Sequence, residues 1–92
     1  MIRKSKITNI LKNNLNIYDL KVIDVSRSHQ GHSGFVEGEE THFKIIVISD
    51  DFKYKKKLDR HRLLNNLLKE EFHTTLHSVS YELLTISESQ KN

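Results

Sequence analysis

Six histidines are the residues of this chain best suited to chemistry, and two of them, His29 and His32, lie close together in a glycine-containing segment. Imidazole is the commonest neutral metal ligand in proteins, so a loop pair at this spacing can reach a single metal centre. The chain contains no cysteine. Any metal would therefore be held by imidazole, or shared with a partner that supplies thiolate. His-x-x-His is a weak signal by itself, and an ordinary flexible loop is the alternative interpretation.

The other histidines carry weaker indications of chemistry. His61 borders an apolar helical face, which favours a structural role, and His73 falls in a polar turn, where we expect it to be solvated. For His42, at the start of an apolar strand, we favour a hydrogen bond to its own loop. His77 shares strand parity with Val79, so a metal ligand and a half-buried structural residue are equally good interpretations.

Length and composition limit the class of protein. A chain of 92 residues forms one domain. No apolar run approaches the roughly 20 residues that cross a bilayer, and no secretory signal is recognised, so we expect a cytoplasmic protein without membrane contact. The net charge of +3 permits nucleic-acid binding without requiring it. The chain lacks a cysteine nucleophile, a Gly-x-Ser-x-Gly elbow and a phosphate-binding glycine loop, so we expect no enzyme.

Hydrophobic periodicity predicts five elements in an α+β fold. They are helix, strand, strand, helix and strand, over residues 7–15, 18–25, 43–48, 58–72 and 77–83. The intervening segment 26–40 is polar, contains all three glycines and is the longest loop. Loops of this length in small domains are commonly functional. Residues 1–86 are predicted to form the domain, and residues 87–92 a polar C-terminal tail that frays.

The order of elements predicts where the histidines meet. The first two strands pair as a hairpin, whereas the helix joining the second and third strands makes that pair parallel. Parallel strands start at the same end of a sheet, so His42 and His77 should share an end. The loop that carries His29 and His32 should lie over that end, and His61 should be excluded from it.

Three motifs in this order resemble those of the BolA family over nearly the whole chain. They are Glu40-Thr41-His42-Phe43, Arg60-His61-Arg62 and Leu76-His77. The loop Ser28–Gly34 resembles that of a subgroup found in bacteria and in organelles of bacterial origin. The chain departs from the family at Tyr54, where glycine is usual, and at Thr85–Glu88, which lacks the usual proline and tryptophan.

The resemblance implies a BolA-like fold similar to the type II K-homology domain, with a three-stranded mixed sheet packed by helices on one face. It further implies an iron–sulfur cluster assembly or trafficking adaptor that binds a [2Fe–2S] cluster jointly with a monothiol glutaredoxin. Glutaredoxin and glutathione would supply thiolates, and the imidazole ligands would be His77 and either His32 or His29. No cofactor is expected in the isolated protein, which should be a monomer or a weak homodimer.

The alternative function is a DNA-binding transcriptional regulator of the BolA type, acting in morphology or stress response. The candidate contacts are four lysines in one turn: Lys53, Lys55, Lys56 and Lys57. These lysines can contact phosphates, but the chain lacks the GxxG loop with which K-homology domains approach a nucleic-acid backbone. A solvated turn is an equally good interpretation of the run.

Overall fold

The computed structural model describes residues 2–91, except for the side chain of His29. The regular elements, in chain order, are α1 Ile2–Asn14, β1 Asp19–Asp24, the 3₁₀ turn η1 Ser26–His29, β2 His42–Ile48, the 3₁₀ turn η2 Asp50–Phe52, α2 Lys57–Leu67, α3 Lys69–Phe72, β3 Ser78–Leu84 and α4 Ile86–Ser89. Within the described part of the chain, no helix is long and apolar enough to cross a membrane.

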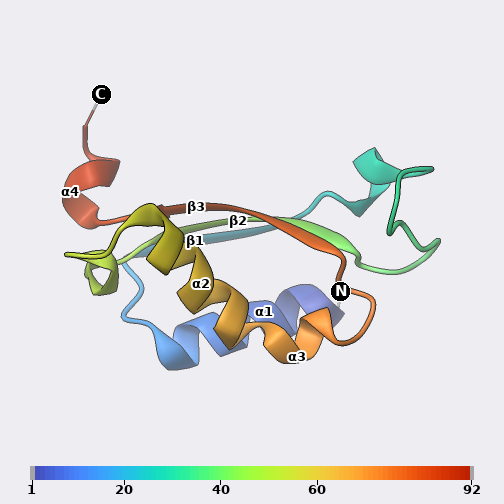
Figure 1. Cartoon of the computed structure of the whole chain (residues 1–92), viewed down its shortest axis with the longest axis horizontal. Helices are drawn as coiled ribbons and strands as arrows, with labels where there is room; N and C mark the ends of the chain where they lie inside the picture. The colour runs from blue at the N-terminus through green and yellow to red at the C-terminus, as the bar shows by residue number, and fades with distance from the viewer. Residues whose placement is uncertain (1, 92) are drawn as a thin grey trace.

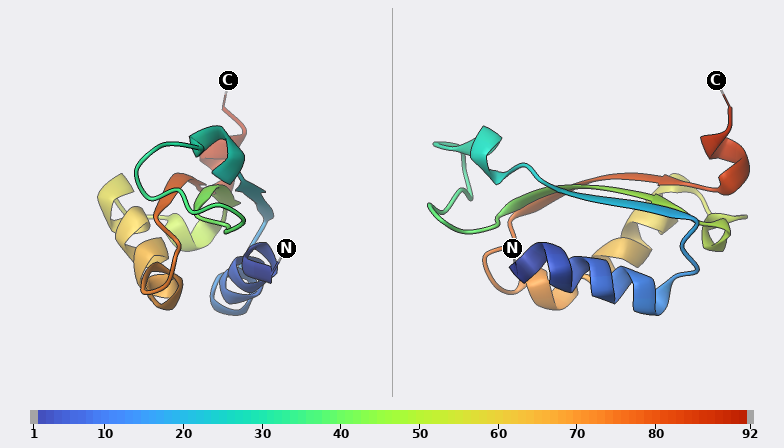
Figure 2. Two further views of the ribbon diagram at one scale, coloured as in Figure 1. Left: turned by 90° about the vertical axis from the view of Figure 1, so that its right-hand side faces the viewer. Right: turned by 180° about the vertical axis from the view of Figure 1, so that it is seen from behind.

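The strands form a mixed sheet in the order β1-β2-β3. Strand β2 pairs antiparallel with β1 and parallel with β3. Helices α1, α2 and α3 lie on one face of this sheet (Figures 1 and 2). The predicted α+β class, the order of strands and the mixed three-stranded sheet are confirmed.

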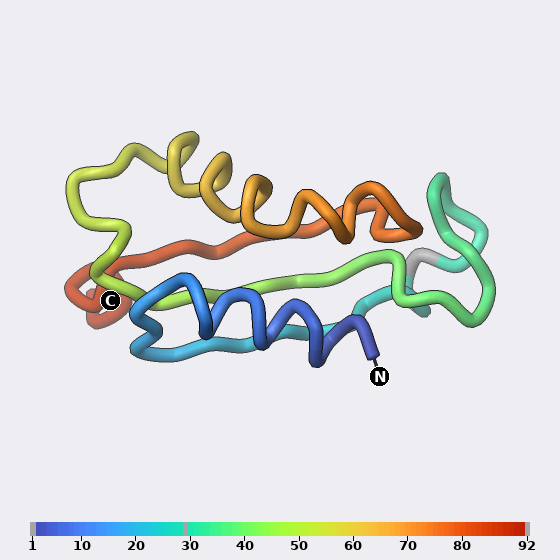
Figure 3. Tube along the Cα trace, turned by 90° about the horizontal axis from the view of Figure 1, so that it is seen from below, coloured from blue at the N-terminus to red at the C-terminus, as the bar shows by residue number. Residues whose placement is uncertain are grey.

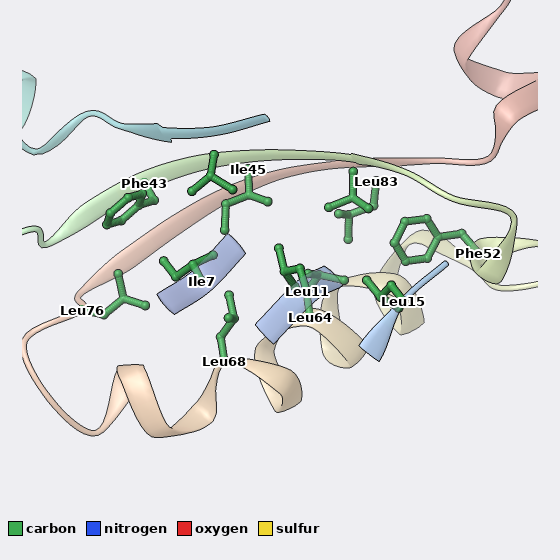
Figure 4. Packing of buried hydrophobic residues seen from close by; sticks show 12 residues of the cluster. Ile7, Leu11, Leu15, Phe43, Ile45, Phe52, Leu64, Leu68, Leu76 and Leu83 are labelled. Carbon is green, nitrogen blue, oxygen red and sulfur yellow. The ribbon is translucent and has the colours of Figure 1, made fainter. Parts of the chain in front are cut away.

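The core lies between the sheet and the helices, where alternate residues of β2 meet one face of α1 and of α2. In β2, Phe43, Ile45 and Val47 are buried, as expected for a strand with one face on the core. Ile7 and Leu11 of α1, spaced i, i+4, point into the same cluster (Figure 4). The spacing of the buried apolar residues in β2 and α1 therefore determines which face of the sheet the helices cover.

The predicted single helix over residues 58–72 is wrong in one respect, because the structure has two helices there. They meet at Leu68, whose φ of −98° and ψ of 9° depart from helical values. Leu64 and Leu68 are both fully buried. The apolar spacing continues across the break, so hydrophobic periodicity could not reveal the change in backbone torsion.

The expectation that residues 87–92 fray is wrong for residues 87–89, which belong to α4. The hydroxyl of Thr85 accepts a hydrogen bond from the N–H of Glu88 at 3.1 Å, and the Glu88 carboxylate accepts one from the N–H of Thr85 at 2.8 Å. This is a capping box. The buried Arg60 also binds Glu88, with 2.6 Å between Nη1 and Oε1. The Thr-x-x-Glu pattern was a local signal for this helix.

Candidate functional site

The loop between β1 and β2 is closed at its base by one serine. The buried hydroxyl of Ser26 accepts hydrogen bonds from the N–H groups of Thr41 and His42, at 2.9 and 3.1 Å, and donates one to Asp24 Oδ1 at 2.6 Å. These bonds join the two ends of the loop. The loop lies at the same end of the molecule as the turn that enters β3, and it extends beyond the sheet (Figures 1 and 3).

The start of β3 is attached to the end of the same loop. The N–H groups of His77 and Ser78 donate to the carbonyl of Thr41 at 2.9 and 3.2 Å. Thr41 is fully buried. The backbone of His77 is therefore held in register with the last residue of the loop, as parallel pairing of the two strands requires.

His42 and His77 lie at the same end of the sheet, as predicted, and their rings are neighbours. Their ring centroids are 5.3 Å apart and the rings are tilted by 47°. His42 is only 4 % exposed, and its Nδ1 lies 2.8 Å from the hydroxyl of Thr41. This agrees with the favoured interpretation of His42 as a structural residue. The side chain of His77 is exposed, so His77 presents an accessible imidazole at this end.

A tight turn of the loop lies against the His77 ring. The N–H of Phe35 donates to the carbonyl of His32 at 3.1 Å, so His32 is the first residue of this turn. At its third position, Gly34 lies so near His77 that an added Cβ would overlap Cγ, Cδ2 and Nδ1 of the imidazole. The structure thus brings the turn that carries His32, an exposed residue, to His77.

The remaining histidines are placed as follows. The ring of His61 packs edge-on against Tyr81, with centroids 5.3 Å apart. This contact fits the structural role predicted for His61. His73 is exposed in the turn after α3, as expected. The candidate side chain of His29 lies outside the described residues.

Arg3 and Glu40 also position this end of the molecule, a role that was not predicted for either residue. The Glu40 carboxylate accepts hydrogen bonds from the N–H groups of Arg3 and Lys4, at 3.1 and 3.2 Å, at the start of α1. The Arg3 guanidinium binds the Glu40 carbonyl, Glu71 Oε1 at 3.0 Å and Thr74 Oγ1 at 2.8 Å. It thereby ties α1 and α3 to the loop end and to the turn before β3. No local spacing pattern indicates these long-range contacts.

His32 and His77 lie outside the cavity beside the loop. That cavity has a volume of about 550 Å³, and its lining includes Arg27, Phe35 and Glu37, but neither His32 nor His77. Among the residues that the structure describes, no group of three or more His, Asp or Glu side chains could hold a metal ion. Among the described side chains at this end, His32 and His77 are exposed imidazoles.

Three comparisons relate this chain to known proteins. A family model described as BolA-like protein matches residues 11–88. Over 89 residues the chain is 38% identical to Protein BOLA1, chloroplastic, of Arabidopsis thaliana, and the alignment covers 95% of this chain and 56% of the relative. Over 69 residues it is 38% identical to the DNA-binding transcriptional regulator BolA of Escherichia coli, covering 75% of this chain and 62% of the relative. The chain thus spans less than two thirds of either relative.

A solved structure shows the same fold. The BolA domain of SufE1 from Arabidopsis thaliana superposes with a TM-score of 0.84 at 35% sequence identity, covering 94% of each chain. The family match includes the loop, the strand-opening histidine and all three strands. From this match and the shared fold, we conclude that the chain belongs to the BolA-like family.

Proposed function

We propose that this protein is an adaptor that binds a [2Fe–2S] cluster jointly with a monothiol glutaredoxin and glutathione, and passes it on without a turnover of its own. The observation that carries this proposal is the exposed imidazole of His77, the residue that immediately precedes β3. Its backbone is anchored to Thr41, and the turn beginning at His32 lies against its ring.

The available donors fit a shared cluster better than a cluster held by this chain alone. A [2Fe–2S] centre takes four ligands besides its sulfides, for example four thiolates, or two thiolates and two imidazoles. The chain has no thiolate to offer. His77 with one loop histidine would complete the set if glutaredoxin and glutathione supply the sulfur ligands. Imidazole ligation raises the reduction potential relative to thiolate alone, as in Rieske centres.

Anaerobic reconstitution tests this proposal directly. A monothiol glutaredoxin and glutathione are loaded with cluster, with and without this protein, and visible absorption and circular dichroism are recorded. We expect a heterodimer with an altered cluster spectrum, which reverts to that of the glutaredoxin homodimer with His77→Ala. His73→Ala is the matched control, because His73 is also an exposed histidine before β3. A His77→Ala complex with the wild-type spectrum and lifetime would contradict the proposal.

A second candidate function, regulation through DNA binding, is favoured by one observation in the lysine turn. Tyr54 adopts a positive φ of 65° and its side chain is fully exposed between the lysines of residues 53–57. Backbone strain at a non-glycine residue often marks a functional site. An exposed aromatic ring among lysines suits base stacking with phosphate contacts. Against this, Lys53 already pairs with Asp50, with 3.5 Å between Nζ and Oδ2.

DNA oligonucleotides, single-stranded and duplex, test this second function by fluorescence anisotropy at several salt concentrations. Binding through the turn should weaken steeply with salt, because phosphate contacts release counterions. At a fixed salt concentration, Tyr54→Gly should bind DNA more weakly than the wild type, without unfolding the protein. Affinity unchanged by Tyr54→Gly and by neutralising Lys55 and Lys56 would remove this candidate.

A further inference from the structure

The turn that begins at His32 has a backbone reason to contain Gly34. The hydrogen bond from the Phe35 N–H to the His32 carbonyl closes a four-residue turn. Gly34 stands at its third position with φ of +81°. A turn with positive φ at this position, such as type II, favours glycine because a Cβ makes that backbone conformation costly.

Gly34 also meets a second, steric demand that is independent of the first. An added Cβ would overlap three atoms of the His77 ring, Cγ, Cδ2 and Nδ1. These are the ring atoms closest to Cβ of His77. The ring cannot yield by a shift of the backbone, because the N–H of His77 is bonded to Thr41. It could yield only by rotating about its side-chain torsions, and so leaving its present position.

Gly38 provides an internal comparison within the same loop. It too stands at the third position of a turn, closed by a hydrogen bond of 3.0 Å from the Glu39 N–H to the Val36 carbonyl. Its φ is +78°, but an added Cβ would have no atom within 4 Å. Gly38 thus meets only the backbone demand, whereas Gly34 meets the backbone demand and the steric one.

We propose that Gly34 is a positioning residue for His77: its bare backbone packs on the imidazole, holds one orientation of the ring and directs Nε2 to the cluster. The three atoms nearest to a Cβ built on Gly34 include Nδ1 of His77, and they do not include Nε2. A metal on Nδ1 would have to fit beside the Gly34 backbone. His42 restricts the ring from a second element, with centroids 5.3 Å apart.

This inference rests on the proposed function of His77 as a cluster ligand and adds how that ligand is prepared. The contact couples the ring to the turn that starts at His32, so both histidines are presented by one local structure. A ligand that is already oriented loses less conformational freedom on binding. Residues that orient metal ligands typically contribute about 10- to 100-fold to metal affinity.

The test compares Gly34→Asn with Gly38→Asn. Asparagine tolerates positive φ better than other residues with a Cβ, so both variants carry a similar backbone cost and differ in the contact with His77. The first readout is the Cδ2–Hδ2 cross-peak of His77 in the isolated protein. The second is the lifetime of the shared cluster with glutaredoxin, followed by circular dichroism. We expect Gly34→Asn to shift the cross-peak and shorten the lifetime about tenfold, and Gly38→Asn to change neither.

The outcomes separate this inference from the proposed function. If the His77 cross-peak is unchanged in Gly34→Asn, as is expected in Gly38→Asn, the positioning role of Gly34 is wrong. This holds even if His77→Ala abolishes the shared cluster and so supports the proposed function. A shifted cross-peak in a protein that never forms a shared cluster would support the positioning role and overturn the adaptor function. A measurement on the unaltered protein needs no variant to fold: a nuclear Overhauser effect between Gly34 Hα and His77 Hδ2 is expected, and its absence would overturn the inference.

Discussion

The N–H of His77 donates to the carbonyl of Thr41 at 2.9 Å. The residue immediately before β3 is thus attached to the last residue of the loop. Thr41 is in turn bonded through its own N–H to the hydroxyl of Ser26. The candidate ligand is therefore supported by a continuous set of hydrogen bonds from the far end of the loop. Changes at the loop base should reach His77 through these bonds.

Ser26→Ala should destabilise the fold by about 1–3 kcal/mol, the cost of leaving buried N–H groups without a partner. The hydroxyl of Ser26 serves the N–H groups of Thr41 and His42, and nothing in alanine replaces it. Urea unfolding measures the loss. Ser28→Ala is the control, because the exposed Ser28 hydroxyl only donates to the Val25 carbonyl. Equal effects of the two variants would contradict the role of Ser26.

Tyr54→Gly should stabilise the protein by about 1 kcal/mol, because glycine adopts positive φ without the steric cost that a Cβ imposes. The Tyr54 side chain is fully exposed, so its removal sacrifices no packing. Tyr54→Ala, which removes the ring but keeps the Cβ, is the control and should give little gain. Thermal and urea unfolding of both variants decide the matter. A glycine variant no more stable than the alanine variant would show that the turn is unstrained.

The ion pair of Arg60 with Glu88 should make stability depend on acid pH. The hydrogen bond from Arg60, aided by the backbone N–H of Thr85, lowers the pKa of Glu88 from 4.5 to about 2. A carboxyl whose pKa is depressed by folding stabilises the protein above its ordinary pKa, and this contribution is lost as the pH falls from about 4.5 towards 2.

Glu88→Gln should therefore be less stable at pH 7, by about 1 kcal/mol for a partly exposed pair, and should lose less stability between pH 4.5 and 2. Urea unfolding across this pH range provides the measurement. Glu82→Gln, at an exposed position in β3, is the control and should follow the wild-type profile. Parallel pH profiles for Glu88→Gln and the wild type would exclude Glu88 as the titrating group.

Arg3→Ala should cost about 2 kcal/mol, since it removes a partly buried guanidinium that bonds the loop end, α3 and the turn before β3. It should also speed hydrogen exchange at the His77 amide, because that turn would open more readily. Hydrogen exchange followed by NMR reports both effects. Lys6→Ala, at an exposed position in α1, is the control. If Arg3→Ala leaves hydrogen exchange at the His77 amide unchanged, the contacts of Arg3 do not support the position of His77.

Much of the fold was predictable because its signals are local. The apolar run Phe43–Ile48 predicts the central strand, and the helical connection between β2 and β3 predicts that these two strands are parallel. That parallel pairing places His42 and His77 at one end of the sheet. The capping box of Thr85 and Glu88 was equally local, and the expectation of a frayed tail overlooked it.

The three strands, their pairing, the end of the sheet that His42 and His77 share and the lack of thiolate could all be predicted from the sequence. These follow from periodicity, connection rules and composition, which act over a few residues or are general to all chains. The contact of Gly34 with the His77 ring and the hydrogen bond that Glu40 accepts at the start of α1 arise from tertiary packing. Such contacts join segments far apart in the chain. They depend on how the loop and helices pack together, and no spacing in the sequence records that packing.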